Sequence, residues 1–172
     1  MANSTRFRGL VAQLYATDFP AAQSAWVEEF LVLLVELRRA FGNDLDKVIV
    51  LSIIGQRLLR DPAMPVLSHV DAQQSLIAES MVRNTNIDAI ARVSRIPRES
   101  VRRKVGELIA DGLVQRDDSG GLAIRAGAAA RLAPSAHVSI AMLDAVVAKY
   151  LGRMCDVGLV SAVTLPRPSH KA

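Results

Sequence analysis

Basic side chains are concentrated in one part of this chain. Between Arg83 and Arg116 there are eight basic and four acidic residues, which gives that segment a net charge of +4. All 172 residues together also carry a net charge of +4, so the charges outside the segment cancel. A basic patch on an otherwise neutral body is the electrostatic pattern of a protein that binds a polyanion.

Residues that support other kinds of chemistry are scattered. The three histidines, His69, His137 and His170, lie far apart and show no ligand-like spacing with Cys155, so we expect no metal site. The sequence contains no phosphate loop, no nucleophile elbow and no acid/base pair, so we expect neither an enzyme nor a bound cofactor. Cys155 lies in an apolar stretch, which favours an inert buried thiol over a redox sensor.

Two short helices around a turn must position the basic residues. Thr85 to Asp88 has the pattern of a capped helix start, and the inner face of this helix consists of Ile87, Ile90, Ala91 and Val93. Ser94 to Ile96 is the predicted turn. Pro97 suits the first position of the next helix, where its missing N–H is not needed.

The second helix divides its residues between two faces. The apolar spacing predicts a buried stripe made of Val101, Val105, Leu108 and Ile109. Glu99, Arg102, Arg103 and Gly106 point away from that stripe, and Arg98 and Ser100 lie at the leading end. Gly112 is placed to end the helix in the left-handed conformation. Residues 113–116 and 122–125 are then expected to pair as a small hairpin.

The flanking sequence is expected to be helical. Residues 1–20 are read as an N-terminal arm or a short helix. Apolar spacing predicts helices over residues 21–41 and from about 44 to 60, and the chain then breaks at Asp61-Pro62 and Pro65. Further helices are expected over residues 71–78, 128–133 and 139–157, with Pro134 separating the last two. The tail from Pro166 onward is expected to be disordered.

Composition bounds the class of protein. The length fits a single domain over residues 1–172, with N-terminal helices at 21–60, the basic centre at 80–126 and C-terminal helices at 128–160. The positive mean hydropathy favours apolar surface buried between two copies, hence a homodimer. No apolar run reaches the roughly 18 residues of a membrane span. We expect no signal peptide, and the single cysteine fits a reducing, cytoplasmic location.

The stretch IARVSRIPRESVRRKVGELIADGLVQR resembles the winged helix-turn-helix transcriptional regulators of the MarR, GntR and IclR kinds. The likeness covers about 40 residues and is carried by the proline turn, the basic helix, the glycine stop and the following strand. The matching residues are Pro97, Arg98, Ser100, Val101, Arg102, Arg103, Val105, Leu108, Gly112, Leu113 and Val114. The flanking helices match only in layout, like the dimerising helices of MarR-type proteins.

This resemblance implies a mainly α fold with a small β-hairpin wing, flanked by dimerisation helices. It also implies double-stranded DNA as the partner, with the basic helix in the major groove and the wing against the backbone or the minor groove. An arginine fork can contact guanine edges or phosphate oxygens, and a hydroxyl can bond a phosphate. The expected DNA-binding residues are Thr85, Arg95, Arg98, Glu99, Ser100, Arg102, Arg103, Lys104, Arg116 and Arg125.

Two features of the pattern leave alternatives open. The wing tip carries Asp117 and Asp118, which would repel phosphate, unlike the basic tip of many wings. Glu99 and Arg103 are spaced to pair along the helix, as on an ordinary solvated face. The alternative function is a winged-helix protein–protein interaction module whose basic face binds an acidic partner. The sequence names neither an operator nor an effector ligand, although a small-molecule effector remains possible.

Overall fold

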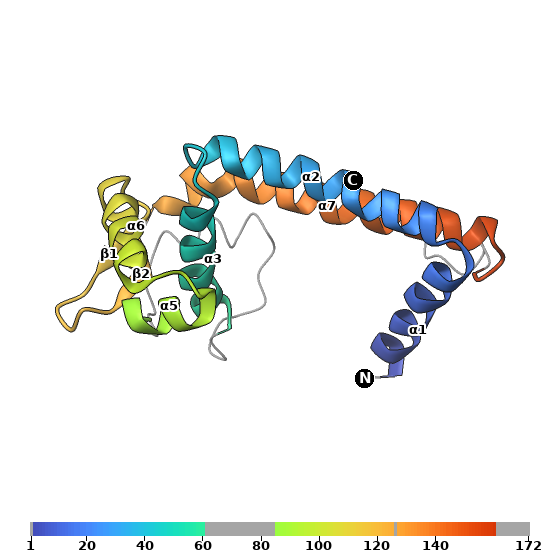
Figure 1. The fold of residues 1–172 in the computed structure, drawn as a ribbon, viewed down its shortest axis with the longest axis horizontal. Coiled ribbons are helices and arrows are strands. Elements are labelled where there is room, and N and C mark those ends of the chain that lie inside the picture. The colour runs from blue at the N-terminus through green and yellow to red at the C-terminus, as the bar shows by residue number, and fades with distance from the viewer. Residues whose placement is uncertain (1, 61–84, 126, 161–172) are drawn as a thin grey trace, which may run out of the picture. The chain divides into compact units, whose positions relative to one another are not determined.

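The computed structural model describes residues 2–60, 85–125 and 127–160, and in these ranges the chain is mainly helical with one small antiparallel hairpin. Figure 1 shows the elements in chain order. They are α1 (Ala2–Thr17), α2 (Phe19–Ala40), α3 (Leu45–Leu59), α5 (Ile87–Ser94), α6 (Arg98–Ala110), β1 (Val114–Arg116), β2 (Leu122–Ile124) and α7 (Ala128–Asp156). The predicted helix at 71–78 and the predicted tail disorder lie outside the described residues.

The chain divides into two compact units, which we treat separately. The helical unit contains the residues up to Val35 and those from Val138 onward. The central unit runs from Glu36 to His137 and contains α3, α5, α6 and the hairpin. Since the basic segment of the sequence falls in the central unit, that unit holds the candidate site.

One hydrophobic core holds the central unit together. The predicted stripe of α6 is confirmed, because Val101, Val105 and Leu108 are fully buried while Ile109 packs against the core from its edge. The remaining buried residues come from α3, α5, the turn, the hairpin region and the start of α7: Val50, Leu51, Ile54, Ile90, Ile96, Leu113, Val114, Leu122 and Ala128. Burial of side chains of this size stabilises the fold by roughly 1.5–3 kcal/mol each, so this core fixes α6 against α3 and α5.

The turn between α5 and α6 is short and has a defined conformation. Arg95 adopts the left-handed conformation with φ 59°, and its backbone N–H donates to the carbonyl of Ala91. Pro97 precedes α6 as its N-cap, one position before the predicted one. Asn86 caps α5 by accepting from the N–H of Ala89, so the predicted cap at Thr85 is wrong by one residue.

Thr85 has a different role, which explains the shift. It forms an isolated antiparallel bridge with Leu122, and its carbonyl accepts a 2.8 Å hydrogen bond from the Leu122 N–H. The hairpin itself pairs Val114 with Ile124 and Arg116 with Leu122. The chain just before α5 is therefore tied to the edge of the hairpin, which leaves the next residue to cap the helix.

The prediction that Pro134 would break the C-terminal helix is wrong. α7 runs without interruption from Ala128 to Asp156 with Pro134 inside it. Pro134 lies in the second turn, where a proline removes one backbone hydrogen bond and usually kinks or breaks a helix. Ala128 is buried and Leu132 packs against the central core, so tertiary packing holds the first turns in helical form.

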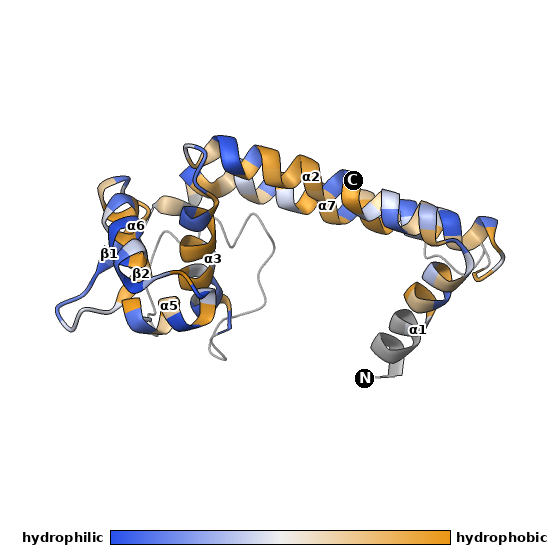
Figure 2. Cartoon of the chain, in the orientation of Figure 1, coloured by the Kyte–Doolittle hydropathy of each residue, from blue (hydrophilic) through white to orange (hydrophobic). Residues whose placement is uncertain are grey.

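The helical unit has a smaller core of its own. Leu14, Ala22 and Met154 are buried there, and the hydroxyls of Tyr15 and Tyr150 form a 2.8 Å hydrogen bond. Hydrophobic residues also recur along α2 and α7 in Figure 2. Among the described residues, seven large apolar side chains of this unit are exposed on the two helices: Phe19, Leu31, Val32, Val35, Ile140, Leu143 and Val147. None of the helices in the described ranges is long and apolar enough to cross a membrane.

An ion pair fastens α6 to the start of α3. Asp44 caps α3 by accepting a 3.0 Å hydrogen bond from the N–H of Lys47, and its other carboxylate oxygen accepts from the ammonium group of Lys104. The Lys104 side chain is only 5% exposed. Burial by itself would raise the pKa of Asp44, but the hydrogen bonds from Lys104 and from the Lys47 backbone lower it below its ordinary value.

We predict that Lys104→Met lowers the free energy of unfolding by about 2 kcal/mol, because Asp44 loses a charged hydrogen-bond donor. Urea denaturation monitored by circular dichroism measures this change. Arg102→Met is the matched control on the exposed face of the same helix, and its effect should stay within about 0.5 kcal/mol. Equal stabilities of the two variants would contradict a structural role for Lys104.

The same pair gives stability a pH dependence. Because the pKa of Asp44 is lowered in the folded state from its ordinary 3.8, protons bind the unfolded chain more tightly. The pair therefore makes its full contribution to the free energy of unfolding above pH 3.8, and this contribution is lost as the pH falls through the lowered pKa of Asp44 in the folded state. We predict that the stability difference between the wild-type chain and Lys104→Met narrows on acidification. A constant difference between pH 7 and strong acid would be the opposite outcome.

Candidate nucleic-acid interface

The structure places most of the predicted site residues on the surface around α6. Seven of the ten are exposed, and Ser100 is half-buried near the start of the helix. The exposed residues are Arg95, Arg98, Glu99, Arg102, Arg103, Arg116 and Arg125. Since Val101 and Val105 are fully buried, the arginines of α6 lie on the face opposite the core.

Thr85 does not belong to this surface. Its relative exposure is 4%, and its hydroxyl oxygen has no hydrogen-bond partner among the described residues. The backbone bridge to Leu122 holds the residue inside the central unit. The prediction that this hydroxyl contacts phosphate is therefore corrected, because the side chain is turned away from solvent.

The prediction that Lys104 contacts DNA is also corrected. This residue is 4% exposed, and its ammonium group pairs with Asp44 instead of facing a ligand. Helical phase explains this position, since Lys104 follows Val101 by three residues and precedes Leu108 by four. The sequence signal was present, because residues at these spacings share one face. The cation was counted as part of the basic patch although the helix turns it toward α3.

Carboxylates already hold the exposed arginines of α6. The Arg98 guanidinium contacts Asp88 at 2.5 Å, and Glu99 lies 3.7 Å from Arg98 and 3.4 Å from Arg102. Arg103 pairs with Glu107 at 2.9 Å, so the expected pair of Arg103 with Glu99 is replaced by one a turn further on.

These arginine pairs are weak and exchangeable. The arginine side chains of Arg98, Arg102 and Arg103 are between 54% and 64% exposed. Ion pairs at such exposure contribute about 0–1 kcal/mol, so a phosphate can displace the carboxylate without disturbing the fold. The carboxylates set the resting positions of the guanidinium groups and do not prevent them from binding an anion.

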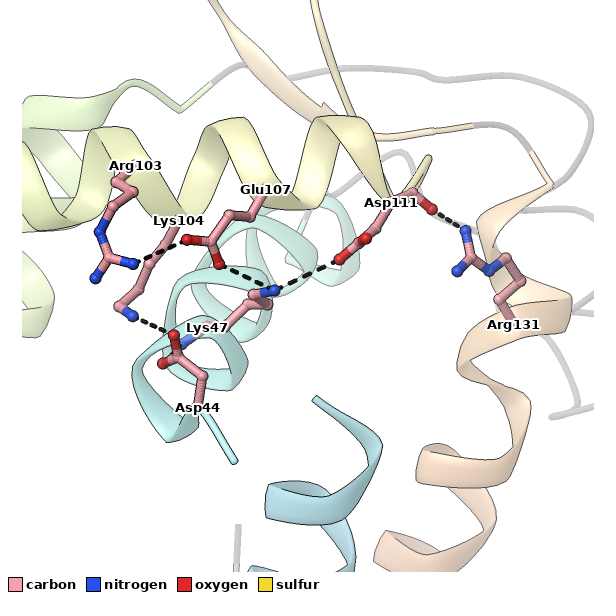
Figure 3. A network of polar contacts seen from close by, with 7 residues as sticks. All are labelled: Asp44, Lys47, Arg103, Lys104, Glu107, Asp111 and Arg131. Atoms are coloured by element: carbon pink, nitrogen blue, oxygen red, sulfur yellow. Dashed lines mark hydrogen bonds and ion pairs between the residues drawn. The ribbon is translucent and has the colours of Figure 1, made fainter. Parts of the chain in front are cut away.

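A second network lies behind the arginines, between α6 and the start of α3 (Figure 3). The ammonium group of Lys47 lies 3.0 Å from Glu107 and 3.5 Å from Asp111, and its side chain is 15% exposed. The hydrogen bond to Glu107 raises the pKa of Lys47, and the same contact lowers the pKa of Glu107. Sequence reasoning missed Lys47 and Glu107 as site residues, because their partners lie about 60 positions away in the chain.

The far end of α6 brings two further cations together. Asp111 follows α6, and its backbone carbonyl accepts from the guanidinium of Arg131 on α7. A Cβ added at Gly112 would lie 3.5 Å from Nη1 of Arg131 and 3.6 Å from Nη1 of Arg125. Gly112 itself has φ +68°, as predicted for the left-handed residue that ends the helix.

The acidic tip of the hairpin is structured by hydrogen bonds within its own turn. Asp117 accepts hydrogen bonds from the hydroxyl and N–H of Ser119 and from the N–H of Gly121. The Ser119 contact and these backbone bonds lower the pKa of Asp117. Asp117, Asp118 and Arg116 are all exposed. A lowered pKa keeps the Asp117 carboxylate ionised, so both aspartates repel phosphate at the hairpin tip.

Within the described ranges no cluster of three or more His, Cys, Asp or Glu side chains is arranged to hold a metal ion. No family model matches the chain, and neither does any curated protein or solved structure with which it was compared. The function must therefore be argued from the geometry of the central unit.

The double role of Glu99 gives a prediction. Glu99→Gln removes the carboxylate that faces both Arg98 and Arg102, so we expect affinity for duplex DNA to rise about two- to fivefold, the usual range of a surface ion pair. Fluorescence anisotropy with a labelled duplex measures it. Asp46→Asn on α3 is the matched control, since it makes the same charge change at an exposed acid away from these arginines. An equal gain in both variants would show a general charge effect and contradict a local role for Glu99.

Proposed function

We propose that this chain is a sequence-specific regulator of transcription that binds double-stranded DNA as a homodimer, with α6 as its recognition helix. The observation that carries the proposal is the division of α6 into two faces. Val101, Val105 and Leu108 are completely buried, while Arg102 and Arg103 are exposed on the other side. A rigid helix that presents an arginine row can enter the major groove and contact base edges and phosphates.

The arrangement around α6 supports a winged helix-turn-helix. α5, a three-residue turn and α6 follow one another, and β1 and β2 form the hairpin directly after α6. The isolated bridge of Thr85 to Leu122 adds a short pairing at the edge of the hairpin. In this proposal β1, β2 and their connecting turn form the wing, which Arg116 and Arg125 hold to the DNA backbone.

The contact surface of α6 has room for a duplex. A Cβ added at Gly106 would meet no atom within 4 Å, so the outward face is open at that position. Absence of a side chain there lets the helix backbone approach the groove closely. Arg98, Arg102 and Arg103 are the proposed readers. Ser100 and Arg95, near the start of the helix, are proposed to contact phosphates.

The exposed apolar residues of the helical unit support pairing with a second copy. On α2 they are Phe19, Leu31, Val32 and Val35, and on α7 they are Ile140, Leu143 and Val147. The α7 residues follow at spacings of three and four, and Val35 follows Leu31 and Val32 at four and three, so each set lies along one side of its helix. Exposed apolar surface of this kind marks a protein contact, and a symmetric dimer would read an inverted repeat with two copies of α6.

The experiment that tests the function is selection of duplexes from a random pool, followed by affinity measurements over a range of salt concentrations. Neutralisation of phosphates requires the logarithm of the binding constant to fall steeply with the logarithm of salt concentration. An enriched inverted repeat bound with such a slope supports the proposal. Failure to enrich any sequence, together with salt-insensitive binding, would favour the protein–protein interaction module instead.

We predict that Arg103→Ala weakens binding to the selected sequence by about 1–3 kcal/mol and relaxes the preference at one base pair. Arg57→Ala, at an exposed arginine of α3, is the control and should leave affinity and preference unchanged. Competition against single-base variants of the selected site measures both quantities. Arg103 is not a base reader if its removal weakens all duplexes by the same factor.

A further inference from the structure

A polar hollow lies where α6 ends, next to the starts of α3 and α7. It has a volume of about 330 Å³, within the range of small-molecule sites, and all its lining residues belong to the central unit. The lining residues are Ala40, Phe41, Gly42, Lys47, Asp111, Leu113, Arg131, Leu132 and Ser135. Apolar side chains form one part of this wall and charged side chains form the other.

Positive charge outweighs negative charge at this hollow. Lys47 and Arg131 line it, and the Arg125 guanidinium approaches the same glycine, Gly112, as that of Arg131. The carboxylate among the lining residues is that of Asp111, which lies 3.5 Å from the Lys47 ammonium and is 48% exposed. Glu107, outside the lining, lies 3.0 Å from the same ammonium group. Among the lining residues two cations accompany one carboxylate, so the hollow has an excess of positive charge that favours an added anion.

The α6 terminus accounts for part of this cation cluster. Carbonyl groups at the end of a helix attract cations, and Arg131 donates to the carbonyl of Asp111. A single guanidinium is enough for that role. The ion pairs with Glu107 and Asp111 account for the position of Lys47. Neither they nor the capping contact explains why the Arg125 guanidinium approaches the same glycine as that of Arg131.

We propose that this hollow binds a small oxyanion, a carboxylate or a phosphate group, between Lys47 and Arg131. One oxygen of the ligand takes the place of the Asp111 carboxylate at the Lys47 ammonium, and the other accepts from the Arg131 guanidinium. Phe41, Leu113 and Leu132 lie against any apolar part of the ligand. A carboxylate with a short hydrocarbon chain and an inorganic phosphate test the two sources of the same chemistry.

The consequence of binding rests on the proposed function. Charges alternate along a chain of contacts from Arg103 to Glu107, to Lys47 and to Asp111 (Figure 3). An anion that draws the Lys47 ammonium into the hollow leaves Glu107 with Arg103 as its remaining partner in this chain. Glu107 then holds the Arg103 guanidinium more strongly, and displacement by DNA becomes less favourable. Anion and DNA therefore weaken each other's binding by the same factor.

The site is tested first without DNA. Isothermal titration calorimetry of the full chain uses sodium butyrate and sodium phosphate separately, at an ionic strength held constant with sodium chloride. We expect saturable binding of at least one probe, and no binding of butyramide, which has the same shape as butyrate without its charge. Absence of binding by both anions would overturn the proposal.

Variants locate the bound anion. Arg131→Gln should raise the Kd of the bound probe at least about tenfold, the usual effect of losing a charged hydrogen bond. Ala40→Glu places a carboxylate at the exposed edge of the hollow and should abolish binding with no cation removed. Arg102→Gln is the control, because it removes an arginine from the outer face of α6. Loss of binding in Arg102→Gln, but not in the other two, would place the anion on that face and overturn the site.

The coupling is measured on the selected duplex at constant ionic strength. The probe that binds should lower DNA affinity about fivefold or more, a typical size for coupling between two sites, and should have no effect on Ala40→Glu. Unchanged DNA affinity at saturating probe would overturn the coupling and leave the calorimetric site standing. If the chain binds no duplex, the proposed function fails, and the calorimetry still decides whether the hollow takes an oxyanion.

Discussion

The carboxylate of Asp44 is the contact on which the position of α6 depends. One of its oxygens accepts the backbone N–H that starts α3, and the other accepts the ammonium group of Lys104 in the middle of α6. Hydrophobic packing buries Val101, Val105 and Leu108 and so turns one face of α6 toward the core, but its attraction has no preferred direction. The charged hydrogen bond does have a direction, and it fixes which side of α6 faces α3. Arg102 and Arg103, the two residues before Lys104, are thereby kept on the outer side.

The charged groups of the central unit form two layers with different properties. In the inner layer, Lys104 and Lys47 are 5% and 15% exposed and have fixed partners, so they hold helices in place. In the outer layer the arginines are more than half exposed, and water screens their pairs with carboxylates. Glu107 belongs to both layers, since it contacts Lys47 and Arg103. The carboxylate of Glu107 thus connects the packing of α6 against α3 with the position of the exposed Arg103 side chain.

The sequence predicted local structure well and long-range contacts poorly. Periodicity identified the buried stripe of α6, and the positive φ of Gly112 follows from its place after the helix, because both depend on neighbours within one or two turns. Thr85 and Lys104 were misassigned because their environment is set by Leu122 and Asp44, which are distant in the chain. The predicted break of α7 failed for a similar reason, since tertiary packing outweighs the local effect of a proline. A count of charges finds a basic segment but does not separate cations that support the fold from cations that face solvent.

The pairing of every α6 arginine with a carboxylate has a consequence for the sequence specificity of the proposed DNA binding. A guanidinium with no partner would bind any phosphate, and the chain would be held on DNA of every sequence. A guanidinium that binds a phosphate must first leave Asp88, Glu99 or Glu107. The binding free energy is then only the difference between its ionic contact with the phosphate and its ionic contact with the carboxylate. A guanine edge offers two hydrogen-bond acceptors in the plane of the guanidinium, so binding to it contributes more free energy than a single ionic contact does. In the proposed function, the acidic partners thus lower affinity for DNA of any sequence more than they lower affinity for the correct base. The modest net charge of +4 would then serve discrimination better than a larger one.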